Sequence, residues 1–210
     1  MTEELNDYIL SHISPEPDDL RELERDVNVR LLYPRMCSGH LQGRILKMLT
    51  SMIAPKRVIE LGTYAGYSAL SIAEGLAEDA EIHTIEADDE MEDFIRRRLD
   101  RSPHGHKVHL HIGPAEEVIP TLPGGWDMAF IDANKRSYVD YYEAILPRMN
   151  PGGYILADNT LWGGKVADPS ARDPQTLGIR AFNDLAARDP RVETVILPLR
   201  DGLTMIHLLD

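Results

Sequence analysis

From Arg57 to the C-terminus, short apolar segments typical of strands alternate with amphipathic segments long enough to form helices. The strand candidates are residues 57–61, 81–86, 107–112, 127–132, 154–158, 192–197 and 203–209. The helix candidates between them include residues 68–76, 90–99, 137–149 and 176–188. Such alternation is typical of βαβ units with right-handed crossovers and a mostly parallel sheet. Only residues 198–202 separate the last two strands, which is too short for a helix, so these strands are expected to form an antiparallel hairpin. The pattern predicts an α/β fold with a doubly wound, Rossmann-like sheet of seven strands.

The first 55 residues follow a different, helical pattern. Residues 18–32 place apolar side chains at helical spacing, namely Leu20, Leu23, Val27, Leu31 and Leu32. A second helix is expected from about Gly39 to Pro55. We therefore expect an N-terminal helical cap (1–55) that belongs to the same single domain as the main part (56–210). The apolar face of the first helix is expected to pack on the main part or on a second subunit.

Composition limits the class of protein. Lys and Arg total 22 against 35 Asp and Glu, a net charge of -13, which disfavours a general nucleic-acid binder. The single cysteine, Cys37, excludes an intrachain disulfide and argues against a structural zinc site. The first ten residues lack the pattern of a secretory signal, and no apolar run reaches the roughly 18 residues of a membrane span. These features predict a soluble cytoplasmic protein without a membrane segment.

A glycine-containing loop follows the first predicted strand. Open α/β sheets bind ligands at the carboxyl ends of their strands, and Gly62 and Gly66 allow close backbone approach there. Three residues separate these glycines, unlike the G-x-G-x-x-G spacing that seats a pyrophosphate, so a nucleoside ligand without phosphates is favoured. Glu86 ends the second strand, where an acid can accept both hydroxyls of a ribose. A plain tight turn and a solvated carboxylate are the structural alternatives.

Acidic and amide side chains follow the fourth and fifth predicted strands. Asp132 ends the fourth strand, and Asp158 and Asn159 end the fifth. Their oxygens suit a hard cation such as Mg²⁺, whereas isolated strand-end aspartates commonly cap helices or turns. Lys135 follows three residues after Asp132. Burial and a bound cation would lower the pKa of Lys135 into the range of a general base; a solvated lysine is the alternative.

Two other patterns are interpreted as structural. The segment 104–111 is rich in histidine, and His109 and His111 would share one face of the third strand. Because this strand is expected at the sheet edge, we interpret these histidines as solvated or lightly packed rather than as metal ligands. Met48, Met52 and Met149 are interpreted as core side chains.

Four motifs give the chain its family resemblance. They are ELGTYAGYS (60–68), FIDANK (130–135), DNTLWGG (158–164) and LPLRDGLT (197–204), and the joint occurrence of the second and third is specific. From about Met36 onward the chain resembles the cation-dependent class I S-adenosylmethionine O-methyltransferases, the caffeoyl-CoA and catechol group, of a bacterial small-molecule type. The resemblance implies strand order 3-2-1-4-5-7-6 with the last strand antiparallel, and a homodimer.

The resemblance also implies residue roles. The residues implied to line the S-adenosylmethionine site are Met36, Ser38, Glu60, Gly62, Thr63, Ser68, Glu86, Ala115 and Asp132. Among them, Glu86 would hold the ribose, Ala115 would lie against the adenine, and Met36 and Ser38 would close near the sulfonium. The implied cation ligands, with Mg²⁺ preferred over Mn²⁺ or Ca²⁺, are Asp132, Asp158 and Asn159. Lys135 would be the catalytic base beside Asp132.

The sequence thus predicts an O-methyltransferase that moves a methyl group to a metal-chelated hydroxyl of a catechol-like or other vicinal-diol small molecule. Trp162 is expected to stack on an aromatic acceptor or to pack ordinarily. One alternative acceptor is the 5-hydroxyuridine at a tRNA wobble position, which the charge of -13 opposes. A second alternative is a non-catalytic nucleotide-binding module, which would not need the acids and the lysine. A dehydrogenase lacks support because of the glycine spacing.

Overall fold

The computed structural model describes residues 2–209 and divides the chain into two compact units. Unit 1 comprises the residues up to Lys56 together with Thr63–Ile112. Unit 2 comprises Arg57–Gly62 and the residues from Gly113 onward. The expected division into a cap (1–55) and a main part (56–210) within one domain stays a prediction.

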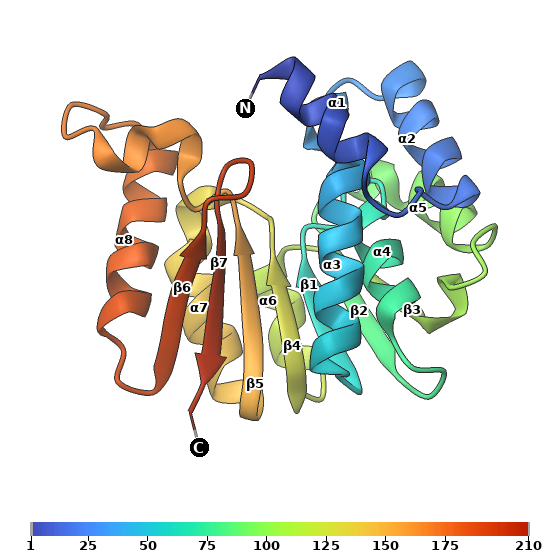
Figure 1. Cartoon of the computed structure of the whole chain (residues 1–210). Helices are drawn as coiled ribbons and strands as arrows, with labels where there is room; N and C mark the ends of the chain where they lie inside the picture. Colours follow the sequence, from blue (N-terminus) through green and yellow to red (C-terminus); the bar gives the residue numbers. More distant parts are fainter. Residues whose placement is uncertain (1, 210) are drawn as a thin grey trace. The chain divides into compact units, whose positions relative to one another are not determined.

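The strands form a seven-stranded sheet of order β3-β2-β1-β4-β5-β7-β6, which confirms the predicted fold class and strand order (Figure 1). Their bounds are β1 (Arg57–Leu61), β2 (Glu81–Glu86), β3 (Val108–Ile112), β4 (Trp126–Ile131), β5 (Met149–Asp158), β6 (Val192–Leu197) and β7 (Leu203–Leu208). β7 pairs antiparallel with both β5 and β6, as the short connection between the last two strands predicts. β5 begins earlier than predicted, because the segment from Met149 pairs with β4 through a register shift.

The helices agree with the predicted segments apart from two additions. Their bounds are α1 (Glu3–Ser11), α2 (Asp18–Arg30), α3 (Gly39–Ile53), α4 (Tyr67–Gly75), α5 (Glu92–Leu99), α6 (Ala115–Val118), α7 (Tyr138–Ile145) and α8 (Pro174–Arg188). The sequence analysis did not predict α1 or the one-turn α6. None of the described helices is long and apolar enough to cross a bilayer.

Helix α2 of unit 1 buries its apolar stripe within the chain. Leu20, Leu23 and Val27 of α2 are buried, and α2 packs against α4. These side chains are therefore not available to a second subunit. The helix ends at Arg30, so Leu32 is exposed rather than on the helix face.

The interpretation of two α3 methionines as core side chains is wrong. Met48 is 61% exposed and Met52 is 76% exposed. The buried stripe of α3 instead includes Leu46 and small or polar residues such as Gly43, where an added Cβ would lie 2.8 Å from Tyr67 of α4. The close approach of α3 to α4 uses this glycine, so the larger methionines lie on the solvent side.

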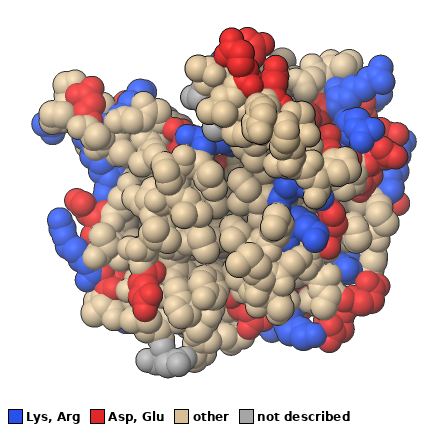
Figure 2. Space-filling model, in the orientation of Figure 1, with Lys and Arg blue, Asp and Glu red and all other residues tan. Residues whose placement is uncertain are grey.

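In unit 2 the core lies between the strands and the helices α7 and α8, which cover one face of them (Figure 1). Phe182 of α8 packs edge-on against Tyr138 and Tyr142 of α7, with ring centroids 5.5 and 5.9 Å apart. The other face of β5, β7 and β6 carries mainly uncharged side chains (Figure 2). Helix α7 begins at Tyr138, whose hydroxyl lies at the carboxyl ends of β4 and β5.

Candidate active site

The carboxyl ends of β4 and β5 bring two aspartates together in unit 2. These strands are parallel neighbours, and Ile131 pairs with Ala157 in their register. The next residues, Asp132 and Asp158, therefore lie opposite each other on strands about 4.8 Å apart. Strand pairing alone thus gives two carboxylates at one edge of the sheet, as the sequence predicts.

Tyr138 ties these two strand ends together. Its buried hydroxyl donates to the carbonyl oxygens of Ile131 (3.2 Å) and Asp158 (3.0 Å), the residues at or beside each aspartate. Burial, with the nearby charges of Asp132 and Asp158, raises the pKa of Tyr138 well above its ordinary value. The hydroxyl therefore keeps its proton and remains a donor at neutral pH.

Lys135 forms an ion pair with Asp132. Its Nζ donates to Oδ1 of Asp132 at 2.5 Å and lies 5.2 Å from the centroid of the Tyr138 ring. Only 11% of the Lys135 side chain is exposed. Burial raises the pKa of Asp132, Lys135 opposes that rise, and the neighbouring charge of Asp158 adds to it. The charge of Arg200 also lowers the pKa of Asp132, so two cations, Lys135 and Arg200, act on the two carboxylates of this corner.

Helix α8 approaches the backbone of Lys135 closely. A Cβ added at Gly178 would lie 2.4 Å from the carbonyl oxygen of Lys135. A larger residue at this position would push the segment that carries Lys135 away from α8. Gly178 is therefore a determinant of the Lys135 position, and no sequence pattern singles it out.

The segment after β5 has an unusual backbone. Asn159 and Trp162 have positive φ angles of 60° and 48°, and Gly163 and Gly164 continue this left-handed run. Asparagine tolerates this region better than most residues, whereas tryptophan is strained there. The N–H of Trp162 donates to the carbonyl oxygen of Asn159 at 3.2 Å.

The turn between β6 and β7 holds this segment. Thr160 N donates to the carbonyl oxygen of Gly202 (3.1 Å), and Leu161 N donates to that of Asp201 (2.8 Å). Gly202 has φ +89°, and a Cβ there would lie 2.5 Å from Cγ of Leu161. The LPLRDGLT motif therefore supports the segment that carries Asn159 and Trp162.

Gly62, at the end of β1, also contacts the site backbone. A Cβ at Gly62 (φ +95°) would lie 2.3 Å from the carbonyl oxygen of Asp132, and Asp132 N donates to the carbonyl oxygen of Leu61 at 2.9 Å. The packing against Asp132 therefore requires a glycine at position 62, independently of any contact between Gly62 and a ligand. Glu60 of β1 is fully buried, and Ala115 is a buried first residue of α6.

In unit 1, backbone N–H groups orient the carboxylate of Glu86. Tyr64 N donates to Oε2 at 2.6 Å, and Asp88 N donates to Oε1 at 2.9 Å. Each oxygen keeps a further lone pair, so the carboxylate is a prepared acceptor for two donors. Thr63 and Ser68, which belong to the same sequence motif as Tyr64, are buried. The Oγ1 atom of Thr63 lies 2.6 Å from the Oγ1 atom of Thr84.

The predicted cofactor-closing segment of unit 1 is a short 3₁₀ turn before α3. Met36, at the end of this turn, is 57% exposed, whereas Ser38 is buried as the N-cap of α3. The exposed Met36 side chain is free to cover a ligand, and the backbone around Ser38 is fixed by the helix. The ligand role of both residues stays a prediction.

Strand pairing therefore brings Asp132 and Asp158 together, and Asn159 follows Asp158 in the chain. Lys135 joins them through its ion pair with Asp132. The residue roles themselves stay predictions. Three determinants of this geometry were not predicted from the sequence, namely Tyr138, Gly178 and Gly202. Only Gly202 had a signal, because it lies within one of the resemblance motifs.

Comparison with known proteins identifies the family. A family model described as O-methyltransferase matches residues 11–209, so the chain belongs to the O-methyltransferase family. It is 35% identical over 219 residues to caffeoyl-CoA O-methyltransferase 2 of Zea mays, covering 97% of this chain and 82% of the relative.

Solved structures agree with this assignment. The O-methyltransferase TomG from Streptomyces achromogenes, involved in tomaymycin synthesis and solved in complex with SAM, has a TM-score of 0.92 at 27% identity and covers 100% of both chains. The SAH-bound methyltransferase PaMTH1 from Podospora anserina has a TM-score of 0.91 at 32% identity, covering 100% of this chain and 97% of that one.

The bridging hydroxyl of Tyr138 leads to a stability prediction. Tyr138→Phe keeps the ring and removes the donor to Ile131 and Asp158, so the free energy of unfolding should fall by about 1–2 kcal/mol. Tyr154→Phe, at a half-buried residue of β5, is the matched control and should change the free energy of unfolding by less than about 0.5 kcal/mol. Urea unfolding of the two variants checks this. Equal stability of Tyr138→Phe and the unmodified protein would contradict the bridge.

The turn glycine gives a second, matched comparison. Gly202→Ala and Gly164→Ala both place a Cβ at positive φ, but the Cβ at position 164 meets nothing within 4 Å. The contact with Leu161 should therefore make Gly202→Ala less stable than Gly164→Ala by about 1–3 kcal/mol. Denaturant midpoints measure the difference. Two variants of equal stability would show that the turn does not restrain the Asn159 segment.

Proposed function

We propose that this chain transfers the methyl group of S-adenosylmethionine to one of two adjacent hydroxyls of a phenolic or other vicinal-diol small molecule, with a divalent cation bound at the ends of β4 and β5. The observation that carries the proposal is the pairing of Asp132 opposite Asp158, with Lys135 on Asp132 and Tyr138 bridging the strand ends. Membership of the O-methyltransferase family supplies the reaction class.

For the cofactor, the support is the pair of similar structures solved with SAM and SAH. We assign Glu86 as acceptor of the ribose hydroxyls, because both of its oxygens are oriented by backbone N–H groups. Glu60, Gly62, Thr63 and Ser68 are assigned to the methionine part. The remaining cofactor assignments by resemblance are Met36, Ser38, Ala115 and Asp132.

For the cation, the donor set fits the chemistry. Asp132 and Asp158 offer two carboxylates, Asn159 offers an amide oxygen, and burial together with the charge of Asp158 raises the pKa of Asp132. Hard cations such as Mg²⁺ prefer oxygen ligands of this kind. When bound, the cation supplies Lewis acidity that lowers the pKa of an acceptor hydroxyl.

Lys135 is assigned the proton transfer. Its Nζ lies beside Asp132 and 5.2 Å from the centroid of the Tyr138 ring, where it is placed to receive the proton of the acceptor's hydroxyl. Opposite charges cancel when the acceptor oxygen takes the methyl group, so the other residues contribute chiefly by positioning and by excluding water. Trp162 is assigned as a wall for an aromatic acceptor.

The acceptor class rests on similarity and charge. The maize relative is named for caffeoyl-CoA, whose caffeoyl group carries two adjacent phenolic hydroxyls. The net charge of -13 disfavours a tRNA acceptor. A homodimer and a cytoplasmic location stay predictions.

Metal removal tests the proposed reaction. Methyl transfer from labelled S-adenosylmethionine to catechol, caffeate and a flavonoid catechol should fall to background after EDTA treatment and return with Mg²⁺, because the acceptor hydroxyl then loses and regains its cation. Bulk tRNA in a parallel arm tests the alternative acceptor. Full turnover without metal, or methylation of tRNA alone, would overturn the proposal.

Lys135→Met tests the proton transfer. Loss of a general base should reduce kcat by about 10²–10⁴-fold, with a smaller effect on KM. Lys165→Met, an exposed lysine whose Nζ lies 3.6 Å from Asp173, is the matched control and should keep normal turnover. An unchanged kcat in Lys135→Met, measured with the metal-loaded enzyme, would exclude Lys135 as the base.

A further inference from the structure

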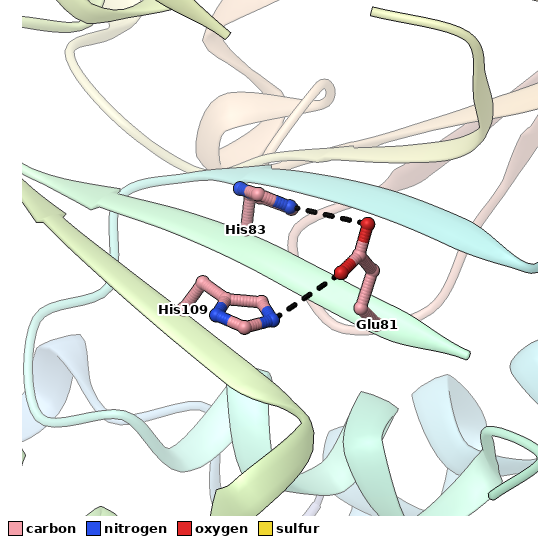
Figure 3. A group of neighbouring side chains, drawn as sticks. All are labelled: Glu81, His83 and His109. Carbon is pink, nitrogen blue, oxygen red and sulfur yellow. Dashed lines mark ion pairs between the residues drawn. The ribbon is translucent and has the colours of Figure 1, made fainter. Parts of the chain in front are cut away.

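A second group of ligand-type side chains lies on one face of β2 and β3 in unit 1 (Figure 3). Glu81 and His83 are two residues apart on β2, so they project to the same face. The parallel register pairs His83 with His109 of β3, which adds His109 to that face. The two strands thus bring together a carboxylate and two imidazoles from separate parts of the sequence.

The distances in this group suit a small metal ion. Oε1 of Glu81 lies 3.5 Å from Nε2 of His83, and Oε2 lies 3.3 Å from Nε2 of His109. Two ligands of a tetrahedral zinc ion lie about 3.3–3.5 Å apart, given zinc–ligand bonds of about 2.0–2.2 Å. One ligand atom from each of the three residues fits within 4.8 Å of the others, and the half-exposed His109 ring can rotate to close the remaining gap.

His111 gives His83 an outer hydrogen-bond partner. Nδ1 of His83 lies 2.9 Å from Nε2 of His111, and the two rings are nearly parallel, with an interplanar angle of 6°. The tautomer in which Nδ1–H of His83 donates to His111 directs the lone pair of His83 Nε2 toward Glu81. Metal-bound histidines typically have such a second partner, which fixes the tautomer and the ring orientation.

We propose that Glu81, His83 and His109 bind one Zn²⁺ or a similar borderline transition-metal ion, with the fourth position open to water, and that His111 positions His83. Imidazole ligands select this class of metal over Mg²⁺ and Ca²⁺, which prefer oxygen. Only the inner His83 is well covered, with 13% of its side chain exposed against 48% for His109, so an ion can enter from the solvent side.

The proposal differs from the interpretation based on the histidine-rich segment alone. That segment supplies His109 and His111, whereas Glu81 and His83 come from the preceding strand. The same segment also contains His106, whose Nε2 lies 3.0 Å from Oε1 of Glu78. His106 is not part of the group formed by Glu81, His83 and His109. His106 is therefore a matched control within the same region.

Calorimetric titration of the metal-free full chain with Zn²⁺ tests the site. We expect one tight zinc equivalent that excess Mg²⁺ does not displace. His109→Ala should weaken it by more than about tenfold, and His111→Phe by about 10- to 100-fold, as for loss of an outer partner. Circular dichroism of each variant verifies folding, which removal of the half-exposed His109 side chain should not disturb.

Two controls separate this site from other zinc binding. His106→Ala and Asp158→Asn should both keep the tight equivalent, the second because it alters only the acids at the ends of β4 and β5. Loss of the equivalent in Asp158→Asn with retention in His109→Ala would assign the zinc to those acids and overturn the proposal. Absence of any binding at submillimolar Zn²⁺ would also overturn it. Because the readout is binding, failure of the proposed methyl transfer leaves this test unaffected.

Discussion

The pairing of β4 with β5 is the interaction on which the candidate active site depends. Parallel strands in register carry their next residues to the same sheet edge, so the strand pairing alone brings Asp132 and Asp158 together. Burial makes the ionised form of Asp132 costly, and the neighbouring charge of Asp158 adds to this cost. The hydroxyl of Tyr138 is hydrogen-bonded to the backbone of both strand ends. The ammonium group of Lys135 partly compensates the charge of Asp132. Two carboxylates beside the amide of Asn159 form a set of oxygen ligands that suits a divalent cation.

Close backbone contacts fix the segments around this corner. Gly62 lies against Asp132, Gly178 against Lys135 and Gly202 against Leu161, and at each position a Cβ would come within 2.5 Å of its neighbour. The first two contacts position Asp132 and Lys135 against β1 and α8, and the third holds the segment between Asn159 and Trp162 against the turn between β6 and β7. Glycine in these places therefore serves packing, and its presence in a motif does not by itself mean ligand contact.

The two proposed metal sites are formed in the same way but offer different ligand atoms. In each, neighbouring parallel strands bring together ligands that are distant in the sequence. The ends of β4 and β5 offer oxygen atoms, which suit hard cations, whereas β2 and β3 offer imidazoles around one carboxylate. Ligand type, rather than position in the fold, is what would give the two sites different metals.

The sequence by itself determined the α/β class, the seven strands, the terminal hairpin and the identity of the acids after β4 and β5. These follow from local periodicity and from connection length, which neighbouring residues encode directly. It also located Glu86 at a strand end, but not the Tyr64 and Asp88 N–H groups that orient it. Only the tertiary structure decided that Tyr138 bridges two strands, that Met48 and Met52 face solvent, and that Glu81 and His83 join His109. Such contacts depend on strand register and on helix orientation, and these are set by the packing of the whole chain rather than by any local pattern.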